Sequence, residues 1–358
     1  MKMMKIDELP VIAQASFQFC GHVDDYLIRR AREVVLVYFQ TRFGKGDHLV
    51  RRYVNGALVE ERAIPFPGSM LGYYLGLRRV WLRELDRFRA GKTEVAALFM
   101  HPLLSVGLSA RRNVRSIFWQ WDYFPGQGVT ERLFNWVADR AARRSHLYLP
   151  LTSAIARAMN RPEAKPLMLG VVPPTRFGTL LQNRILMVGQ LRRGQGIEEL
   201  LGFVSTHAEY SLALMGASAN GFGEEIRRRV AEGGLSNRVY FPDAFVSDAE
   251  LREIAATCFV SLALYDRSPN NLTHYADPGK VKSSIEMGLP VVMTRISEIV
   301  PYVERFRAGE VIDSVSELPQ AIEKIRGGYA TYQAGCRAFA EHFDCARLYD
   351  GLLLPAGL

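Results

Sequence analysis

The sequence has little or none of several features that mark particular classes of protein. Its four cysteines form no CxxC pair and follow no hydrophobic leader, so we expect free thiols in a reducing compartment and no structural zinc. The longest apolar runs, such as residues 258–264, fall far short of the ~20 residues of a membrane span, which excludes an integral membrane protein. Because low-complexity tracts are absent and 48% of residues are apolar, a globular chain is expected.

Positive charge is concentrated in one half of the chain. Residues 1–178 hold 27 Lys+Arg against 15 Asp+Glu, whereas the remainder holds 18 against 22. This balance indicates either an anionic partner for the first half or an arginine-rich surface that is merely solvated. The total of 358 residues suits two domains, and the prolines and glycines of residues 169–181 suit a linker. We therefore predict domains at 1–178 and 179–335, followed by a C-terminal helix at 336–358 that packs back on the first domain.

Hydrophobic periodicity predicts alternating strands and helices in both halves. The first half has strands at 33–40, 95–100, 114–121 and 146–149, a hairpin at 48–63 that turns at Asn55-Gly56, and a helix ending near Arg89. The second half has strands at 184–188, 210–215, 238–241, 259–264 and 290–294, separated by helices at 197–206, 222–232, 248–257 and 280–287. Regular alternation of this kind predicts a doubly wound parallel sheet.

Two glycine loops and one polar loop follow strands of the second half. Residues 188–196 (VGQLRRGQG) come after the first strand, and Gly216 ends the second. Residues 277–294 (DPGKVKSSIEMGLPVVMT) join a polar loop to a short helix and a buried strand. Loops at the carboxyl ends of parallel strands meet at one edge of the sheet, and glycine amides at a helix N-terminus bind anions. Each loop alone is equally consistent with an ordinary turn.

In this order, the segments ILMVGQLRRGQGIEELL, LALMGAS, NRVYFPDAF and DPGKVKSSIEMGLPVVMT resemble the nucleotide-sugar domain of GT-B glycosyltransferases. The resemblance covers residues 184–345 and is to the large retaining group that carries two glutamates eight positions apart. It implies an α/β fold of two Rossmann-like domains facing a cleft, with parallel sheets, to which we add a β-hairpin insertion in the first domain. It also implies a nucleoside diphosphate sugar as donor substrate, with no other cofactor.

Four positions depart from the pattern of that group. Gln190 and Gln195 stand where the group has a loop arginine and lysine, and Tyr275 and Ser283 stand where it has its two glutamates. Nearby cations are able to neutralise a diphosphate in their place. The predicted donor-site residues are Gly189, Gln190, Arg192, Arg193, Gln195, Gly196, Gly216, Phe245, Tyr275, Asp277, Gly279, Lys280, Lys282 and Ser283. No Asp-x-Asp triplet occurs, so we expect no metal on the diphosphate.

The first half offers candidates for the acceptor. Asp122, in the aromatic cluster FWQWDYFP, is similar to an aspartate of related acceptor domains and is suited to orient a hydroxyl, although core packing explains the cluster equally well. His101 follows a strand and is either a sugar contact or a structural histidine. With Lys280, these are the predicted catalytic residues. The helix at 70–89 carries five arginines beside a leucine stripe, which fits either an anionic leaflet or packing on a sheet.

We therefore predict a metal-independent, retaining glycosyltransferase that uses a glycan or lipid-linked acceptor in cell-surface polysaccharide biosynthesis. The protein is expected in the cytoplasm, with peripheral attachment to the inner face of the membrane through the basic first domain. Two alternatives stay open: a transferase-like subunit that has lost catalysis and binds a membrane or a partner enzyme, and a nucleotide-sugar epimerase. Nucleic acid is not expected as a partner, because basic charge is its only support.

Overall fold

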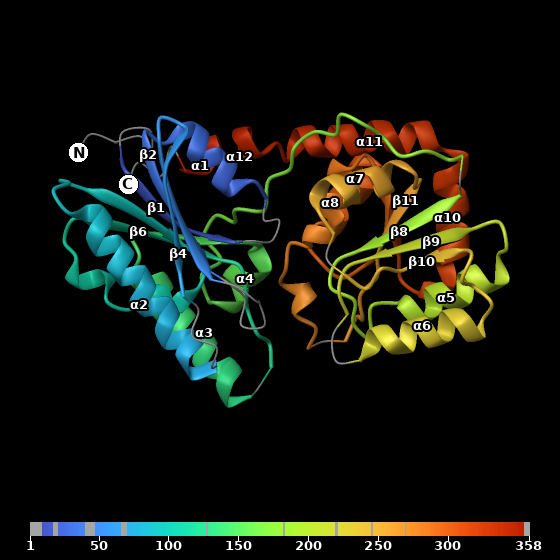
Figure 1. Ribbon diagram of the computed structural model, residues 1–358, viewed down its shortest axis with the longest axis horizontal. Coiled ribbons are helices and arrows are strands. Elements are labelled where there is room, and N and C mark those ends of the chain that lie inside the picture. The colour runs from blue at the N-terminus through green and yellow to red at the C-terminus, as the bar shows by residue number, and fades with distance from the viewer. Residues whose placement is uncertain are drawn as a thin grey trace. The chain divides into compact units, whose positions relative to one another are not determined.

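The computed structural model describes residues 9–16, 21–39, 47–65, 70–126, 128–181, 183–218, 221–244, 246–268 and 270–353. The chain forms two compact α/β units (Figure 1). The first unit comprises Met1–Gly170, Tyr275–Asp277 and Cys345–Leu358, and the second comprises Val171–His274 and Pro278–Asp344. The chain thus passes from one unit to the other four times. The first passage lies at Gly170, and the final helix that joins the first unit begins at Cys345.

The first unit is built on a seven-stranded sheet in the order β4-β3-β2-β1-β5-β6-β7. Strands β1 (Val11–Ser16), β2 (Glu33–Phe39), β5 (Val95–Phe99), β6 (Val114–Gln120) and β7 (Leu147–Pro150) are parallel, whereas β3 (His48–Val54) and β4 (Ala57–Ile64) pair antiparallel. The helices are α1 (Val23–Arg30), α2 (Met70–Arg89), α3 (Val129–Arg144), α4 (Ser153–Ala158) and α12 (Cys345–Leu353), with short 3-10 turns η2 (Pro102–Ser105) and η3 (Leu108–Ala110).

The central strands of this sheet are hydrophobic on both faces. Every residue of β5 is buried, as are the last six residues of β2, which is typical of parallel strands covered by helices on both sides. The C-terminal helix α12 completes this core. Its Tyr349 is fully buried, packs edge-on against Tyr26 and Trp119, and donates a hydrogen bond to the carbonyl oxygen of Gly21 (2.6 Å).

The second unit is built on a six-stranded parallel sheet in the order β10-β9-β8-β11-β12-β13. The strands are β8 (Arg184–Val188), β9 (Ser211–Met215), β10 (Val239–Tyr240), β11 (Val260–Ala263), β12 (Val291–Thr294) and β13 (Gly309–Ile312). The helices are α5 (Ile197–Thr206), α6 (Phe222–Glu232), α7 (Asp248–Ala256), α8 (Gly279–Glu286), α9 (Val300–Phe306), α10 (Leu318–Gly327) and α11 (Tyr329–His342), with 3-10 turns η4 (Leu272–His274) and η5 (Val315–Glu317). The predicted doubly wound parallel sheet is confirmed.

Both sheets reverse their direction of strand addition once. In the first unit the reversal lies between β1 and β5, and in the second it lies between β8 and β11. The loops after the two strands at such a point run in opposite directions and leave a crevice at their carboxyl ends, where α/β proteins bind ligands. Each unit therefore has one topologically defined place for a ligand. Within the described residues, no helix combines the length and apolar character needed to cross a membrane.

Candidate functional site

The crevice of the second unit is lined by the predicted glycine loop and by the start of α8. Gly189 directly follows β8, Tyr265 lies two residues beyond β11, and Lys280 is the second residue of α8. The side chain of Lys280 runs across Gly189: a Cβ atom at Gly189 would lie 2.5 Å from Lys280 Cε. Glycine at this position therefore makes room for the lysine, whose ammonium group donates a hydrogen bond to Gln195 Oε1 (2.9 Å).

Two cations are held close together at this crevice. Burial, and secondarily the positive charge of Arg192, lowers the pKa of Lys280 to about 8. Arg192 is exposed, and its charge also acts on the pKa of Tyr265, the ring of which lies 5.9 Å from Lys280 Nζ. Among the described residues, neither cation forms an ion pair with a carboxylate. Two like charges without a protein anion between them leave a positive potential at this crevice, which favours negative charge.

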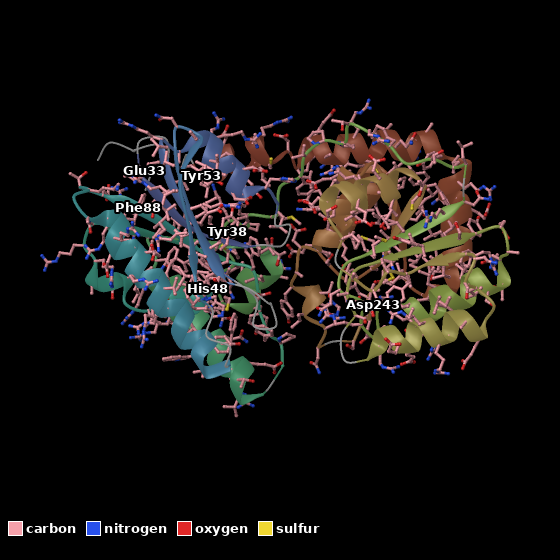
Figure 2. The ribbon with its side chains drawn as sticks, in the orientation of Figure 1. Glu33, Tyr38, His48, Tyr53, Phe88 and Asp243 are labelled. Atoms are coloured by element: carbon pink, nitrogen blue, oxygen red, sulfur yellow. The ribbon has the colours of Figure 1, made fainter. Side chains whose placement is uncertain are left out.

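Close backbone approach fixes the shape of this crevice. Gly216, at the end of β9, has a φ of +139°, and a Cβ there would lie 2.0 Å from the carbonyl oxygen of Gly189. Gly196, which caps α5 with a φ of +72°, would place its Cβ 2.7 Å from Leu264. Both glycines therefore let neighbouring segments pack more tightly than any other residue would. Beside them, Ser218 donates two hydrogen bonds to the carboxylate of Asp243, which Figure 2 labels in this unit.

We expect Gly216→Ala to lower the free energy of unfolding by about 2–4 kcal/mol, because the added methyl group meets backbone rather than a movable side chain. Urea denaturation followed by circular dichroism measures this change. Gly202→Ala is the matched control: Gly202 lies in the interior of α5 with no atom within 4 Å of an added Cβ. Alanine there should raise the stability by up to about 1 kcal/mol. Equal effects of the two variants would contradict the packing role of Gly216.

The remaining predicted residues of this loop region have other surroundings. Arg193 is paired with Glu225 of α6 and lies over the Phe222 ring, 5.2 Å from its centroid. Gln190 is exposed and Gln195 is buried. Gly279 is the first residue of α8, and Ser283 is half-buried within that helix. Of the predicted cations, Lys280 and Arg192 are thus the pair that the structure brings together, while Arg193 is already engaged by a carboxylate.

Three predicted residues are placed elsewhere. Lys282 is buried, with its ammonium group over the Phe343 ring (4.4 Å), because residues two apart on a helix point in nearly opposite directions. Tyr275 and Asp277 belong to the first unit. The Tyr275 ring lies tilted against that of Tyr123 (4.7 Å between centroids), and the buried Asp277 carboxylate accepts a hydrogen bond from the Leu169 amide (2.7 Å). The predicted Phe245 lies outside the described residues.

The crevice of the first unit holds a cavity of about 250 Å³. It lies at the carboxyl ends of the paired strands β1 and β5, and its polar lining residues come from four segments: Gln14 of β1, Asp24 of α1, His101 after β5 and Asp122 after β6. The Gln14 side chain joins two of these segments, because its Oε1 accepts hydrogen bonds from the amides of Met100 and His101 (both 2.8 Å). The structure thus brings His101 and Asp122 to one cavity, together with two residues not singled out as site residues.

His101 is held as a neutral imidazole. Its Nδ1 accepts a hydrogen bond from the Leu103 amide (3.3 Å), and burial lowers its pKa to about 4. The remaining proton is therefore on Nε2, which makes no hydrogen bond to any residue that the structure describes. Its ring centroid lies 6.0 Å from that of Tyr74 of α2 and 5.8 Å from that of Phe134 of α3. His101 is thus positioned to donate one hydrogen bond to a ligand at neutral pH.

Asp122 is the second ionisable group of this cavity. Solvent reaches the residue, but the protein atoms crowded around it desolvate the carboxylate and raise its pKa. Solvent access and desolvation are both expected for a residue that lines a cavity open to water. Asp24 is in the first turn of α1 and accepts a hydrogen bond from Tyr38 (3.2 Å), which Figure 2 labels. Asp122, which lines the same cavity, is 98 residues away in sequence, so no local pattern identifies Asp24 as a cavity residue.

Solved structures share this two-unit architecture. Sucrose-phosphate synthase from Thermosynechococcus elongatus has a TM-score of 0.69 with 13% identity, over 95% of this chain and 96% of that chain. Anabaena HepE in complex with UDP-glucose has a TM-score of 0.67 with 16% identity, over 96% and 98%. The trehalose-6-phosphate synthase from E. coli bound with UDP-2-fluoro glucose has a TM-score of 0.67 with 11% identity, over 97% and 99%.

No family model matches the sequence, and no curated protein sequence matches it either. At identities of 11–16%, the structural likeness establishes the fold. The chain has the GT-B fold of these glycosyltransferases, as the resemblance of residues 184–345 predicted. The likeness extends the prediction, because it covers nearly the whole chain and thus includes the first unit, where sequence motifs gave only a short match.

Proposed function

We propose that the protein is a glycosyltransferase that transfers a sugar from a nucleoside diphosphate sugar to a hydroxyl group of a glycan or lipid-linked acceptor. The observation that carries the proposal is the pair of cations, Lys280 and Arg192, at the glycine loop in the crevice of the second unit. The GT-B fold adds support, and two of the similar structures contain a UDP-sugar. The retaining outcome, the independence from metal and a role in cell-surface polysaccharide biosynthesis belong to this proposal.

In the proposed reaction, the bond between C1 of the sugar and the β-phosphate oxygen breaks as a bond from C1 to the acceptor oxygen forms. Negative charge develops on the departing diphosphate, where Lys280, Arg192 and the amides of the glycine loop stabilise it. Stabilisation of developing charge by fixed groups is commonly the largest contribution to such rates. In the retaining course, the acceptor proton passes to an oxygen of the leaving phosphate, so the products are the nucleoside diphosphate and the new glycoside.

The cavity of the first unit is proposed to bind the acceptor. Asp122 would accept a hydrogen bond from the attacking hydroxyl and orient it, and His101 would donate one from Nε2 to a sugar oxygen. Both assignments rest on the positions of these groups in the cavity, and burial keeps His101 uncharged at neutral pH. Positioning of this kind is effective because a fixed near-attack geometry removes the entropy cost of bringing the reactants together.

Calorimetric titration with UDP, GDP and dTDP tests the donor assignment. At least one nucleotide should bind, and at pH 8 its binding should take up protons from the buffer. The reason is that Lys280 is about half deprotonated there, and a bound diphosphate raises its pKa. Affinity should therefore fall as the pH rises above about 8. Repeating the titration in two buffers of different ionisation enthalpy measures the uptake. Absence of binding by every nucleotide contradicts the proposal, and binding without sugar transfer indicates a subunit that has lost catalysis.

A further inference from the structure

Helix α3 exposes an apolar stripe on the face that points away from the protein. Its inner face is formed by Ala138, Ala141 and Ala142, all buried. On the opposite face, Val129, Leu133 and Trp136 are 83%, 57% and 59% exposed. The spacing of four and three residues places these three side chains in one row along the helix. A contiguous row of large apolar side chains in water is unfavourable and marks an interaction surface.

The same face carries positive charge. Arg132, Arg140 and Arg144 are exposed on α3, and the Arg140 guanidinium lies over the Trp136 ring (5.9 Å). Both carboxylates of the helix are already engaged. Asp139 pairs with Arg143 and Arg161, and Glu131 accepts a hydrogen bond from the Gly128 amide (3.1 Å) at the start of the helix. The apolar row is therefore bordered by cations that no acid on this helix neutralises.

Helix α2 extends this charge. Both helices pack on η2, and the His101 ring contacts Tyr74 of α2 and Phe134 of α3, so the two helices are neighbours (Figure 1). Of the apolar stripe of α2, predicted to face either a leaflet or the sheet, Leu85 and Phe88 are buried in the core, whereas Tyr74 is 37% exposed. Leu77, Val80 and Trp81 of the same helix are also buried. Arg78 and Arg79 are exposed on α2, whereas the exposed Arg83 is paired with Glu84 (3.3 Å). Thus α3 supplies the apolar contacts, and α2 contributes charge alone.

We propose that the outer face of α3, formed by Val129, Leu133, Trp136, Arg140 and Arg144, docks on an anionic lipid bilayer. Aliphatic side chains and an indole ring enter the boundary between headgroups and acyl chains, while arginines bind the lipid phosphates around them. A lipid surface fits this combination because the outer face of α3 offers an apolar row beside cations that its own acids do not neutralise, and the neighbouring α2 adds the exposed Arg78 and Arg79. A second copy of this chain would bring an identical set of cations against them, and like charges oppose such pairing.

This face also has a consequence for the acceptor, which rests on the proposed function. Phe134, on the inner side of α3, touches the ring of His101, and His101 lines the cavity. The docking face and the cavity are therefore separated by the thickness of one helix. An acceptor anchored in the bilayer by a lipid would present its sugar or phosphate end beside the protein while its lipid stays in the membrane. Of the two acceptor classes, this geometry favours the lipid-linked one.

Vesicle binding by the full-length protein tests the docking face. Vesicles of phosphatidylcholine mixed with phosphatidylglycerol should bind the protein, and vesicles of phosphatidylcholine alone should bind it more weakly. Replacing both Leu133 and Trp136 by serine, or both Arg140 and Arg144 by glutamate, should lower the partition coefficient by about tenfold or more. Arg228→Glu is the matched control: this arginine is exposed on α6 of the second unit, and its reversal should leave partitioning nearly unchanged.

Fluorescence locates the contact independently. Trp81 and Trp119 are fully buried and Trp121 is partly buried, whereas Trp136 is 59% exposed. Wild-type protein should show a blue shift when vesicles are added. Trp136→Phe should keep vesicle binding and lose that shift.

Three results would overturn the proposal. The wild-type protein could fail to bind anionic vesicles, or the serine variant could bind them as well as wild type does. The third result is a wild-type dimer in analytical ultracentrifugation together with a monomeric serine variant. Nucleotide binding separates failure here from failure of the proposed transferase, because the α3 variants should bind nucleotide as wild type does.

Discussion

Replacing Lys280 by methionine is expected to lower kcat/KM for the sugar donor by about 100- to 1000-fold, the range found when one group that stabilises developing charge is removed. Methionine keeps the length of the side chain that crosses Gly189 but removes the ammonium group. Because a partly buried charge is lost, the variant should unfold at a temperature no lower than that of wild type. Initial rates of nucleotide release, together with melting curves, measure both quantities.

Lys324→Met is the control for this substitution. Lys324 lies exposed on α10 and pairs with Glu310 (2.8 Å). Its substitution therefore removes one positive charge from the same unit, but outside the crevice. Its kcat/KM should stay within about twofold of wild type, since surface ion pairs contribute little. The Lys280 variant should also keep its weak affinity for the bare nucleoside while losing affinity for the diphosphate. Unchanged turnover, or equal losses for nucleoside and diphosphate, would refute the proposed contact.

Asp122→Asn is expected to lower kcat/KM for the acceptor by about 100-fold or more, because a carboxamide of the same shape is a weaker acceptor and disturbs a positioned hydroxyl. The affinity for nucleotide should not change, since Asp122 belongs to the first unit and Lys280 to the second. The wild-type rate should also fall on acidification through the pKa of Asp122, which burial raises above its ordinary value. This acid limb should be absent from the residual activity of the variant.

Asp25→Asn serves as the matched control for Asp122. Its carboxylate is 62% exposed on α1 and does not line the cavity. Steady-state rates at varied acceptor concentration and pH compare the two variants. If Asp25→Asn reduces the rate as strongly as Asp122→Asn, the effect comes from the overall charge of the first unit and not from a group placed in the cavity.

Local patterns were sufficient to predict most strands and the glycine loop. The predicted strand at 184–188 coincides with β8, and the predicted helix at 222–232 coincides with α6. Each has a hydrophobic period and turn residues within a short window, which is the information that a sequence displays most directly. The crevice at Gly189 was predictable for the same reason, because strand order follows from alternating elements and places loop glycines at the carboxyl edge.

Contacts between distant residues were not predictable in this way. Asp277 has the sequence context of a helix start, yet it bonds to Leu169, 108 positions earlier. Lys280 and Lys282 look equivalent in sequence, and only the orientation of α8 sends one to the crevice and the other toward Phe343. Helix α3, whose outer face is proposed to dock on a bilayer, was likewise not predictable from local sequence. In the sequence, five arginines make residues 70–89 the candidate for membrane contact. The exposure of apolar side chains, which depends on the whole fold, identifies α3 instead.

Helix α12 should determine when the first unit can finish folding during synthesis. Tyr349 of α12 is fully buried against Tyr26 and Trp119, and Gly170 donates its amide hydrogen bond to the Tyr349 hydroxyl (2.8 Å). Domains commonly fold in order as they leave the ribosome. Here the core of the first unit includes a helix that is synthesised after the whole second unit, so a nascent chain stalled before Cys345 should hold an incomplete core. Protease resistance of the first unit should appear only after α12 has emerged.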